Sequence, residues 1–465
     1  MKKTMIILSA LLALVACNKE IPQNEGVIDA SKVVFHINVE TADDAATKGV
    51  KTGWGSGDVV YVFFQDNTTQ YVKMTFNGSS WSYSDKDGGT SYTGLSLAAS
   101  GKKLSAVYMP SFVRGTATPS YKSSKWTIGT SLGGFILTAI NVDYSIASKV
   151  GDIVSLTATL NMTAPDNLVQ VYINASNPAS GNEYVLNMTN VRPFTFDGIF
   201  PGGTATITKG TTNFPMHGYK GTMGSETGYY FWGILNSTSL GSIKYDFQLV
   251  EQNASKGYAI SSKSKTVSSK KLTGPIAIKL SSLTDKGNFV SMGYSGGPLW
   301  ATGNLNQSGK KIVDPLQAGD FVKYGRFNNY SSTTDYTGME SPLSTGSDAA
   351  YKTNTSWRIP TKVQLEALGS NTTHSWKTGW TALGTTKGGY LLTSKSNGIS
   401  LFFAAAGGTD TYGTVYAAGN QLNYWSSTPK DASSSYGIYA LKSESLYFSI
   451  TSMRHDGKNI RPVMN

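Results

Sequence analysis

The sequence feature that most constrains the fold is a nine-residue alternation of apolar and polar side chains at positions 154–162. The apolar members are Val154, Leu156, Ala158, Leu160 and Met162, and the polar members are Ser155, Thr157, Thr159 and Asn161. A period of two is that of a β-strand with one face on a core and the other in water. Shorter apolar runs predict further strands at residues 33–39, 59–64, 169–173, 229–235, 243–249 and 276–280. Turn-forming clusters such as Asn77-Gly78, Asp87-Gly88-Gly89 and Pro201-Gly202-Gly203 separate these runs. The chain is therefore predicted to be mainly β.

Composition supports this prediction and sets the number of domains. Charged residues make up 15% of the chain, against about 25% in an average globular protein. Aromatic residues reach 11%, including 26 tyrosines, and tyrosine favours strands. A length of 465 residues predicts two to four domains.

The first residues have the pattern of an export signal. Lys2 and Lys3 precede an apolar stretch from Met5 to Leu14 that is too short to span a bilayer. The stretch continues into Leu14-Val15-Ala16-Cys17, which resembles the lipobox of bacterial lipoproteins, and Cys17 is the only cysteine. The resemblance implies a signal peptide at 1–16, a lipid on Cys17 that attaches the protein to the outer membrane, and a polar tether at 17–32. A single cysteine excludes intramolecular disulfides.

The net charge is modestly positive. The balance is 40 − 29 = +11, or +9 once Lys2 and Lys3 are removed with the signal peptide. The densest cluster, Lys263, Lys265, Lys270 and Lys271, alternates with serine and has no interleaved aromatics. It is typical of a solvated strand edge protected from aggregation, so no nucleic-acid partner is expected. A mildly cationic surface suits an acidic polysaccharide or a host surface.

Three folded parts are predicted after the tether. Residues 33–205 and 206–284 are interpreted as two β-sandwiches, and residues 285–465 as a separate α+β domain. This last part contains five of the nine tryptophans. It also carries a helix signal, because Thr361 and Gln364 match a capping box and Gly369 is placed for a left-handed C-terminal cap.

The N-terminal part resembles the fimbrillin family of pilus subunits. The segment that carries this resemblance is Thr47-Lys48-(x)-(x)-Lys51-Thr52-Gly53-Trp54-(x)-(x)-Gly57-Asp58-Val59-Val60-Tyr61-Val62, with Phe214-Pro215-Met216-His217-Gly218 further along. The family implies two transthyretin-like β-sandwiches, export as a lipoprotein and polymerisation by strand exchange. It also implies maturation by cleavage after an arginine that ends the first strand. The first arginine here is Arg114, so Lys48 and Lys51 are the candidate cleavage positions for a trypsin-like protease.

The C-terminal part resembles the major paralogous (FISUMP-type) domain of bacterial surface proteins, which implies a C-type-lectin-like fold. Five pieces match in order: 299–305, Trp357-Arg358-Ile359-Pro360-Thr361, Phe403-Ala404-Ala405-Ala406-Gly407, Tyr424-Trp425-Ser426-Ser427-Thr428 and 454–463. Within these pieces Trp357 and Trp425 are interpreted as core anchors. Arg358 and Arg461 are interpreted as side chains that fix loops by hydrogen bonds.

Catalytic and metal-binding interpretations do not fit the residues. Gly293-Tyr294-Ser295-Gly296-Gly297 matches G-x-S-x-G, but a hydrolase elbow needs a helix directly after the serine, and Gly296-Gly297-Pro298 prevents one. Four scattered histidines offer no zinc spacing. Asp85-Lys86-Asp87-Gly88-Gly89 lacks the glutamate that completes a calcium loop. We therefore expect no enzymatic activity, no cofactor and no metal.

What remains is recognition through aromatic and amide side chains. Trp376 and Trp380 belong to a stretch at 371–387 rich in Thr, Ser, Gly and Lys, which is interpreted as a loop. Tyr412, Tyr416, Asn420 and Asn423 belong to a second such stretch. Aromatic faces beside amides suit a sugar ring and equally suit a protein surface. These six residues are the candidate ligand-binding side chains.

The combined prediction is a surface-exposed lipoprotein, the adhesive tip subunit of a pilus. Its expected partners are other pilus subunits and a glycan or protein on another surface. The alternative is an outer-membrane lipoprotein that captures glycans without polymerising. An enzyme comes third.

Overall fold

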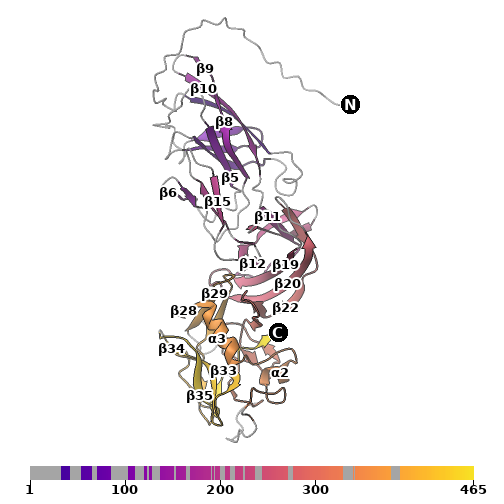
Figure 1. The fold of residues 1–465 in the computed structure, drawn as a ribbon, viewed down its shortest axis with the longest axis vertical. Helices are drawn as coiled ribbons and strands as arrows, with labels where there is room; N and C mark the ends of the chain where they lie inside the picture. The colour runs from indigo at the N-terminus through magenta and orange to yellow at the C-terminus, as the bar shows by residue number, and fades with distance from the viewer. Residues whose placement is uncertain are drawn as a thin grey trace.

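A computed structural model describes most of the chain. The described residues are 33–41, 54–64, 71–84, 103–109, 120–122, 125–127, 137–150, 153–163, 168–189, 191–192, 194–198, 205–209, 215–223, 226–235, 243–270, 276–327, 339, 341–378, 388–442 and 444–464. Three parts follow one another along the long axis of the molecule, with the N-terminal part at one end and the C-terminal part at the other (Figure 1). Among the helices of the described residues, none is long and apolar enough to cross a membrane.

The N-terminal part contains two larger sheets. One sheet has the order β1 (Val33–Thr41), β10 (Ile153–Met162), β9 (Ser145–Val150). The other has the order β4 (Trp81–Ser84), β3 (Tyr71–Phe76), β2 (Val59–Phe64), β5 (Lys103–Met109), β8 (Leu137–Asp143). A short ribbon pairs β6 (Ser120–Lys122) with β7 (Lys125–Thr127). The Phe35 and Tyr83 rings, 5.1 Å apart, connect the two larger sheets.

The alternation in residues 154–162 forms a strand as predicted. In β10 the side chains of Leu156, Leu160 and Met162 are fully buried, whereas Thr159 and Asn161 are exposed. β1 pairs with β10 in parallel, from Val33 opposite Val154 to Thr41 opposite Met162. This long pairing sets one face of both strands on the same core.

The Trp54–Asp58 segment of the fimbrillin-like motif has a structural role. The Trp54 indole Nε1 donates a hydrogen bond to the Val39 carbonyl oxygen at 2.9 Å. The Asp58 carboxylate accepts hydrogen bonds from the Tyr108 hydroxyl at 2.9 Å and from the Gly55 backbone amide at 2.6 Å. The turn therefore connects β1 to the neighbouring sheet.

The middle part consists of two sheets packed face to face. One sheet has the order β13 (Val191–Arg192), β18 (Glu226–Leu235), β11 (Leu168–Ile173), β21 (Ile276–Leu280), with β17 (Tyr219–Met223) also pairing with β18. The other has the order β16 (Met216–His217), β12 (Asn182–Met188), β19 (Ile243–Asn253), β20 (Ala259–Lys270), β22 (Thr284–Gly287). A core that includes Val171, Leu186, Phe231 and Phe247 fills the space between them. A separate ribbon pairs β14 (Phe194–Gly198) with β15 (Ala205–Lys209).

The predicted boundary between the first two parts at residue 205 is wrong. β11 pairs with β18 and β21, and β12 pairs with β19, so residues from Leu168 onward belong to the middle part. The change of sheets lies between Met162 and Leu168. The Pro201-Gly202-Gly203 cluster lies in sequence between β14 and β15, two strands of one antiparallel ribbon.

In the residues that the structure describes, the C-terminal part is built from short strands and two short helices. The strands before the helices are β23 (Phe289–Ser291), β24 (Leu299–Ala301), β25 (Leu305–Asn306), β26 (Lys311–Ile312) and β27 (Val322–Lys323). The helices are α2 (Ala349–Thr353) and α3 (Lys362–Ser370). The strands after them are β28 (Thr372–Thr378), β29 (Gly388–Ser394), β30 (Ser400–Ala404), β31 (Gly408–Thr409), β32 (Val415–Tyr416), β33 (Gln421–Pro429), β34 (Ser434–Leu441), β35 (Tyr447–Met453), β36 (Gly457–Lys458) and β37 (Val463–Met464).

Helix α3 begins where the capping box predicts it. The Thr361 side chain accepts a hydrogen bond from the Gln364 amide, and the Gln364 side chain accepts one from the Thr361 amide. The predicted cap at Gly369 is wrong, because the helix continues to Ser370 and ends on Asn371. Gly369 instead admits the Phe448 ring, since a Cβ there would lie 2.5 Å from Phe448 Cδ2.

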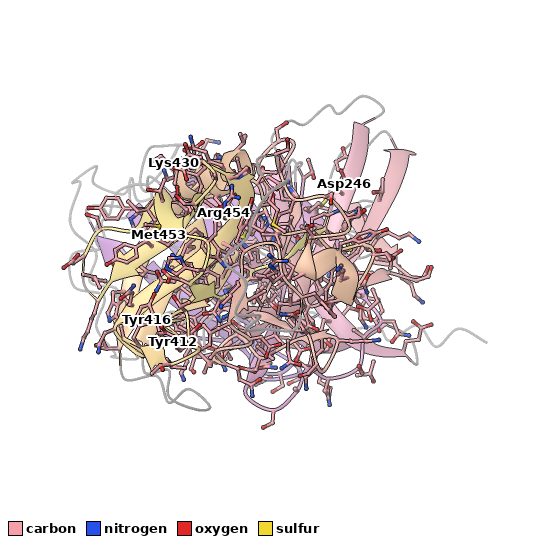
Figure 2. All side chains as sticks on the ribbon, turned by 90° about the horizontal axis from the view of Figure 1, so that it is seen from below. Asp246, Tyr412, Tyr416, Lys430, Met453 and Arg454 are labelled. Carbon is pink, nitrogen blue, oxygen red and sulfur yellow. The ribbon has the colours of Figure 1, made fainter. Side chains whose placement is uncertain are left out.

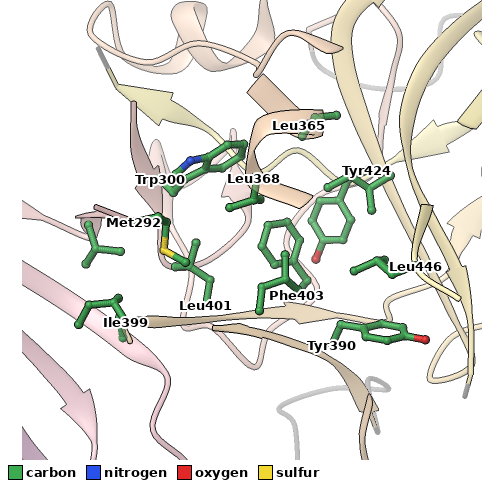
Figure 3. Close-up of a cluster of buried hydrophobic side chains, with 14 of the residues drawn as sticks. Met292, Trp300, Leu365, Leu368, Tyr390, Ile399, Leu401, Phe403, Tyr424 and Leu446 are labelled. Carbon is green, nitrogen blue, oxygen red and sulfur yellow. The ribbon is translucent and has the colours of Figure 1, made fainter. Parts of the chain in front are cut away.

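The middle and C-terminal parts share a buried junction. Figure 3 shows the core of the C-terminal part, with Trp300, Leu365 and Leu368 opposite Phe403 and Tyr424. Val250 and Ala259 of the middle part belong to the same cluster. The Ile260 carbonyl oxygen accepts hydrogen bonds from Thr302 Oγ1 at 2.8 Å and Asn288 Nδ2 at 3.1 Å. The sheet containing β19 and β20 is therefore covered on both faces around Val250 and Ala259.

Candidate functional site

Trp376 lies on a strand, so the prediction that it belongs to a loop is wrong. Trp376 is in β28, opposite Tyr390 of β29, and the two rings meet edge to face at 5.2 Å. Gly388 leaves room for the indole, because a Cβ there would lie 2.8 Å from Trp376 Cζ2. The side chain is half-buried against the core of the C-terminal part. Trp380 lies outside the described residues.

An open hollow of about 660 Å³ surrounds the exposed side of Trp376. It is lined by His374, Trp376, Tyr390, Glu444, Ser445 and Tyr447. The Trp376 indole Nε1 is buried, and no described residue accepts a hydrogen bond from it. The Tyr447 side chain is 51% exposed at the edge of its sheet. The hollow thus offers aromatic faces, and the unpaired indole donor lies beneath its surface. Sequence reasoning missed His374, Tyr390 and Tyr447, because no local pattern distinguishes their rings from those of other strand residues.

Tyr412 and Tyr416 lie on the hairpin formed by β31 and β32. Tyr412 is 90% exposed at its tip, which Asp410 shapes by accepting hydrogen bonds from the amides of Tyr412 and Thr414, both at 2.9 Å. Tyr416 is half-buried against Gly408, where a Cβ would lie 2.7 Å from its hydroxyl. Burial, with the charge of Asp456 as a second cause, raises the pKa of the Tyr416 phenol. Figure 2 shows the two tyrosines next to one another.

The two candidate asparagines have different surroundings. Asn420 is exposed, and its carbonyl oxygen accepts a hydrogen bond from the Lys442 amide at 2.7 Å. Asn423 is 1% exposed, and its Nδ2 donates to the Gly407 carbonyl oxygen at 3.1 Å. The Asn423 side chain therefore fixes the chain at Gly407 and is not available to a ligand, which corrects its place among the binding candidates.

The two predicted binding stretches lie on different sheets. Trp376 belongs to the sheet of β28, β29 and β30, and Tyr416 to the sheet of β27, β36, β31 and β32. Neither Tyr412 nor Tyr416 lines the hollow beside Trp376. The hollow beside Trp376 and the hairpin tip are thus two separate candidate surfaces. Cys17, Lys48 and Lys51, the candidate modification and cleavage positions, lie outside the described residues, as does the Asp85–Gly89 segment.

Buried cations lie beneath the hairpin. Lys323 is 1% exposed, and its Nζ donates to the Thr411 carbonyl oxygen at 3.0 Å, next to Tyr412. Lys458 is 3% exposed, and its Nζ lies 4.8 Å from the centre of the Trp425 ring. Burial lowers the pKa of Lys458 to about 8, although Asp456 acts in the opposite direction. The hairpin is therefore supported from inside the domain.

Replacing Lys458 with methionine should stabilise the domain at pH 7 by about 1–3 kcal/mol. A tenfold change in a protonation equilibrium corresponds to about 1.4 kcal/mol, and the lost cation–π contact offsets about 1 kcal/mol. The pKa of Lys458 is lower in the folded state than in the unfolded state. The cost of this lysine is therefore fully present below pH 8 and disappears between pH 8 and about 10.5. Guanidinium unfolding at pH 7 and pH 10 measures this change.

The control for this prediction is Lys430→Met, which removes an exposed lysine of the same domain. It should leave stability nearly unchanged at both pH values. A Lys458→Met variant whose advantage over the wild type is the same at pH 7 and pH 10 would contradict the assignment.

The Ser295 motif has the structure of a turn. Gly293 and Gly296 have φ values of 75° and 70°, and β24 follows directly at Leu299. A Cβ at Gly297 would lie 2.4 Å from the Tyr294 ring. Ser295 thus lies in a glycine-rich connection that enters a strand, and no helix follows it directly.

Comparison with known proteins gives only distant similarities. No family model and no curated protein matches the sequence. Among solved structures, a candidate cell adhesion protein from Bacteroides fragilis aligns with 56% of this chain and 98% of its own, at 9% identity and a TM-score of 0.32. A fimbrial protein from Bacteroides ovatus aligns with 94% of this chain and 99% of its own, at 11% identity and a TM-score of 0.25. The fimbrial anchor protein Mfa2 from Porphyromonas gingivalis aligns with 50% of this chain and 81% of its own, at 11% identity and a TM-score of 0.22. These values are too low to assign the chain to a family.

Proposed function

We propose that this protein is a surface lipoprotein of the fimbrillin type that serves as the adhesive tip subunit of a pilus. It joins other pilus subunits through strand exchange at its N-terminal part and binds a glycan or protein on another surface through its C-terminal part. The lipobox-like Leu14–Cys17 segment and the fimbrillin-like and FISUMP-like motifs support this proposal.

The observation that carries the proposal is the pairing of β37. In the family that the sequence resembles, a shaft subunit offers a C-terminal strand to its neighbour. Here Val463 and Met464 pair with Trp300 and Leu299 of β24. The Val463 amide also donates a hydrogen bond to the Arg358 carbonyl oxygen, and the Val463 carbonyl oxygen accepts one from the Arg358 amide. Val463 is fully buried. Donating this strand would open the core of its own domain, so a terminal place in the fibre fits better.

The N-terminal strand supports the acceptor role. β1 ends at Thr41, shortly before Lys48 and Lys51, the candidate cleavage positions. Phe35, Ile37 and Val39 of β1 are buried, and β1 pairs with β10 along its whole length. Loss of β1 after cleavage would leave one edge of β10 open to a strand of the same direction from another subunit.

Fibre isolation tests the proposal. Surface fibres sheared from cells should contain the protein at one end, detected by immunogold labelling, and its N-terminal sequence should begin after Lys48 or Lys51. A protein that stays with the membranes and still begins at lipidated Cys17 would rule out fibre incorporation and strand removal. That result would favour the alternative of a non-polymerising glycan-capture lipoprotein.

Tyr412 should contribute to adhesion without contributing to stability. On a glycan array probed with the full-length chain, Tyr412→Ala should weaken binding by about 5- to 100-fold, the usual effect of removing a stacking aromatic. The melting temperature should stay unchanged because the side chain is 90% exposed. Val415→Ala on the same hairpin, where Val415 is 50% exposed, is the matched control. Trp376→Ala is a poorer probe, since this half-buried residue also stabilises the core.

A further inference from the structure

A second cleft lies at the junction of the middle and C-terminal parts. Its volume is about 350 Å³, which is within the range of small-molecule sites. Asn187, Gln248 and Ser264 line it from the middle part, and Ser291, Leu299 and Asn397 line it from the C-terminal part. The hairpin of Tyr412 and Tyr416 is not part of it. In Figure 2, Asp246, which also lines the cleft, lies on the opposite side of the view from both tyrosines.

The floor of the cleft is one row of a three-stranded ladder. Asn187 of β12 is opposite Gln248 of β19, which is opposite Ser264 of β20. Two positions along the strands, on the same face of the sheet, Val185 is opposite Val250, and both side chains pack into the core of the C-terminal part. The next row on the other side pairs the exposed Asp246 with Thr266. Along the strands, the junction is therefore apolar and buried at Val250, polar at Gln248 where the cleft lies, and solvent-exposed at Asp246.

The two amides of this floor have unused hydrogen-bonding groups. Gln248 is 9% exposed, and its Oε1 accepts a hydrogen bond from the Ser291 amide at 3.2 Å. No described residue pairs with the buried Gln248 Nε2, or with the buried Nδ2 and Oδ1 of Asn187. Buried groups of this kind are almost always satisfied, by protein, water or ligand. The remaining amide in the cleft, Asn397, has a partner at both ends, because its Nδ2 donates to the Ser291 carbonyl oxygen and its Oδ1 accepts from the Ile399 amide.

We propose that this cleft binds a single sugar unit through its vicinal hydroxyl groups. A hydroxyl both donates and accepts, so one sugar hydroxyl donates to Asn187 Oδ1 while its neighbour accepts from Asn187 Nδ2. Gln248 Nε2 donates to a third sugar oxygen. Leu299 offers apolar contact to the C–H face of the ring. The site goes beyond the proposed adhesive surface, since it involves the sheet of the middle part.

Saturation-transfer NMR on the full-length chain tests this site. The probes are methyl glycosides of glucose, galactose, mannose and fucose, with 1,3-propanediol as a control that lacks vicinal hydroxyls. Oligosaccharides that end in the same units distinguish a free sugar from the terminus of a glycan. At least one glycoside should receive saturation at about 10 mM, above the millimolar Kd expected of so small a ligand.

Asn187→Leu is the decisive variant. It should reduce sugar affinity at least about tenfold, because the floor loses both the donor and the acceptor of its bidentate contact. It should keep or raise the melting temperature, since no described residue depends on the Asn187 side chain. Asn174→Leu, at an exposed asparagine of the middle part that does not line the cleft, is the matched control.

Three outcomes would overturn the proposal. No glycoside signal at about 10 mM would mean that the cleft holds water only. A signal that survives Asn187→Leu would place the sugar elsewhere. A signal lost in Tyr412→Ala but kept in Asn187→Leu would assign the sugar to the hairpin, which would support the proposed adhesive function while excluding the cleft.

Discussion

Trp425→Ala should lower the free energy of unfolding of the C-terminal part by about 3–5 kcal/mol, as truncation of a fully buried tryptophan does. Trp425 is 1% exposed, and its ring meets that of Tyr324 edge to face at 5.6 Å. Its Nε1 donates to the Val322 carbonyl oxygen at 2.7 Å. The substitution therefore leaves a cavity, a carbonyl group without its donor, and a Lys458 ammonium group without the ring beneath it.

The matched control is Trp357→Ala in the same core cluster. Trp357 is half-buried and contacts Phe289 with ring centres 5.5 Å apart, so its loss should cost about 1–2 kcal/mol. Guanidinium unfolding followed by circular dichroism compares the two variants. If Trp357→Ala were the more damaging substitution, Trp425 could not be the main anchor of this core.

Gly407→Ala should destabilise the same part by more than about 3 kcal/mol and displace the Tyr412 hairpin. Gly407 has a φ of 83°, and a Cβ there would lie 2.0 Å from the Tyr416 carbonyl oxygen and 2.8 Å from the Ala418 nitrogen. Both contacts are with backbone, so no side chain can move away to relieve them. The Asn423 hydrogen bond to Gly407 would be strained by the same shift.

Gly296→Ala separates the two causes of this effect. Gly296 has a similar φ of 70°, but a Cβ there meets no atom within 4 Å. It should therefore cost only the strain of a left-handed alanine, about 1–2 kcal/mol. Equal melting temperatures for the two variants would show that the overlap at Gly407 is relieved at little cost.

Local patterns predicted the elements of this fold well. The alternation at 154–162 formed β10, and the Thr361–Gln364 capping box set the start of α3. Both depend only on neighbouring residues, because the alternation of strand side chains repeats every two residues and a capping box spans four. The buried positions of Trp425 and Arg461 also agree with their interpretation as structural residues, since Arg461 donates to the carbonyl oxygens of Ala301 and Phe402.

Features that depend on distant pairing were not predictable in the same way. The boundary placed at residue 205 was wrong because β11 pairs with β18 and β21, which come later in the chain, and no local signal records this pairing. The ladder row of Asn187 and Gln248 is likewise formed by strands about 60 positions apart.

The candidate binding residues show the same limit at the level of side chains. Trp376 lies in a strand whose polar sequence gives no alternation, so it was interpreted as a loop residue. Asn423 carries a side chain typical of binding sites, yet its surroundings are set by Gly407, sixteen positions earlier. Tyr412 is the candidate whose exposure agrees best with the sequence argument.

The pairing of β37 with β24 also has a kinetic consequence. Val463 pairs with Trp300, a separation of 463 − 300 = 163 positions. The sheet of β23, β24 and β37 can therefore form only when both ends of the C-terminal part are present. Contacts of such long range slow folding, because the loop must close before the pairing contributes. During synthesis the strands of the two upstream parts are complete before Val463 leaves the ribosome. We therefore expect this protein to mature in stages, with its C-terminal part acquiring native structure last.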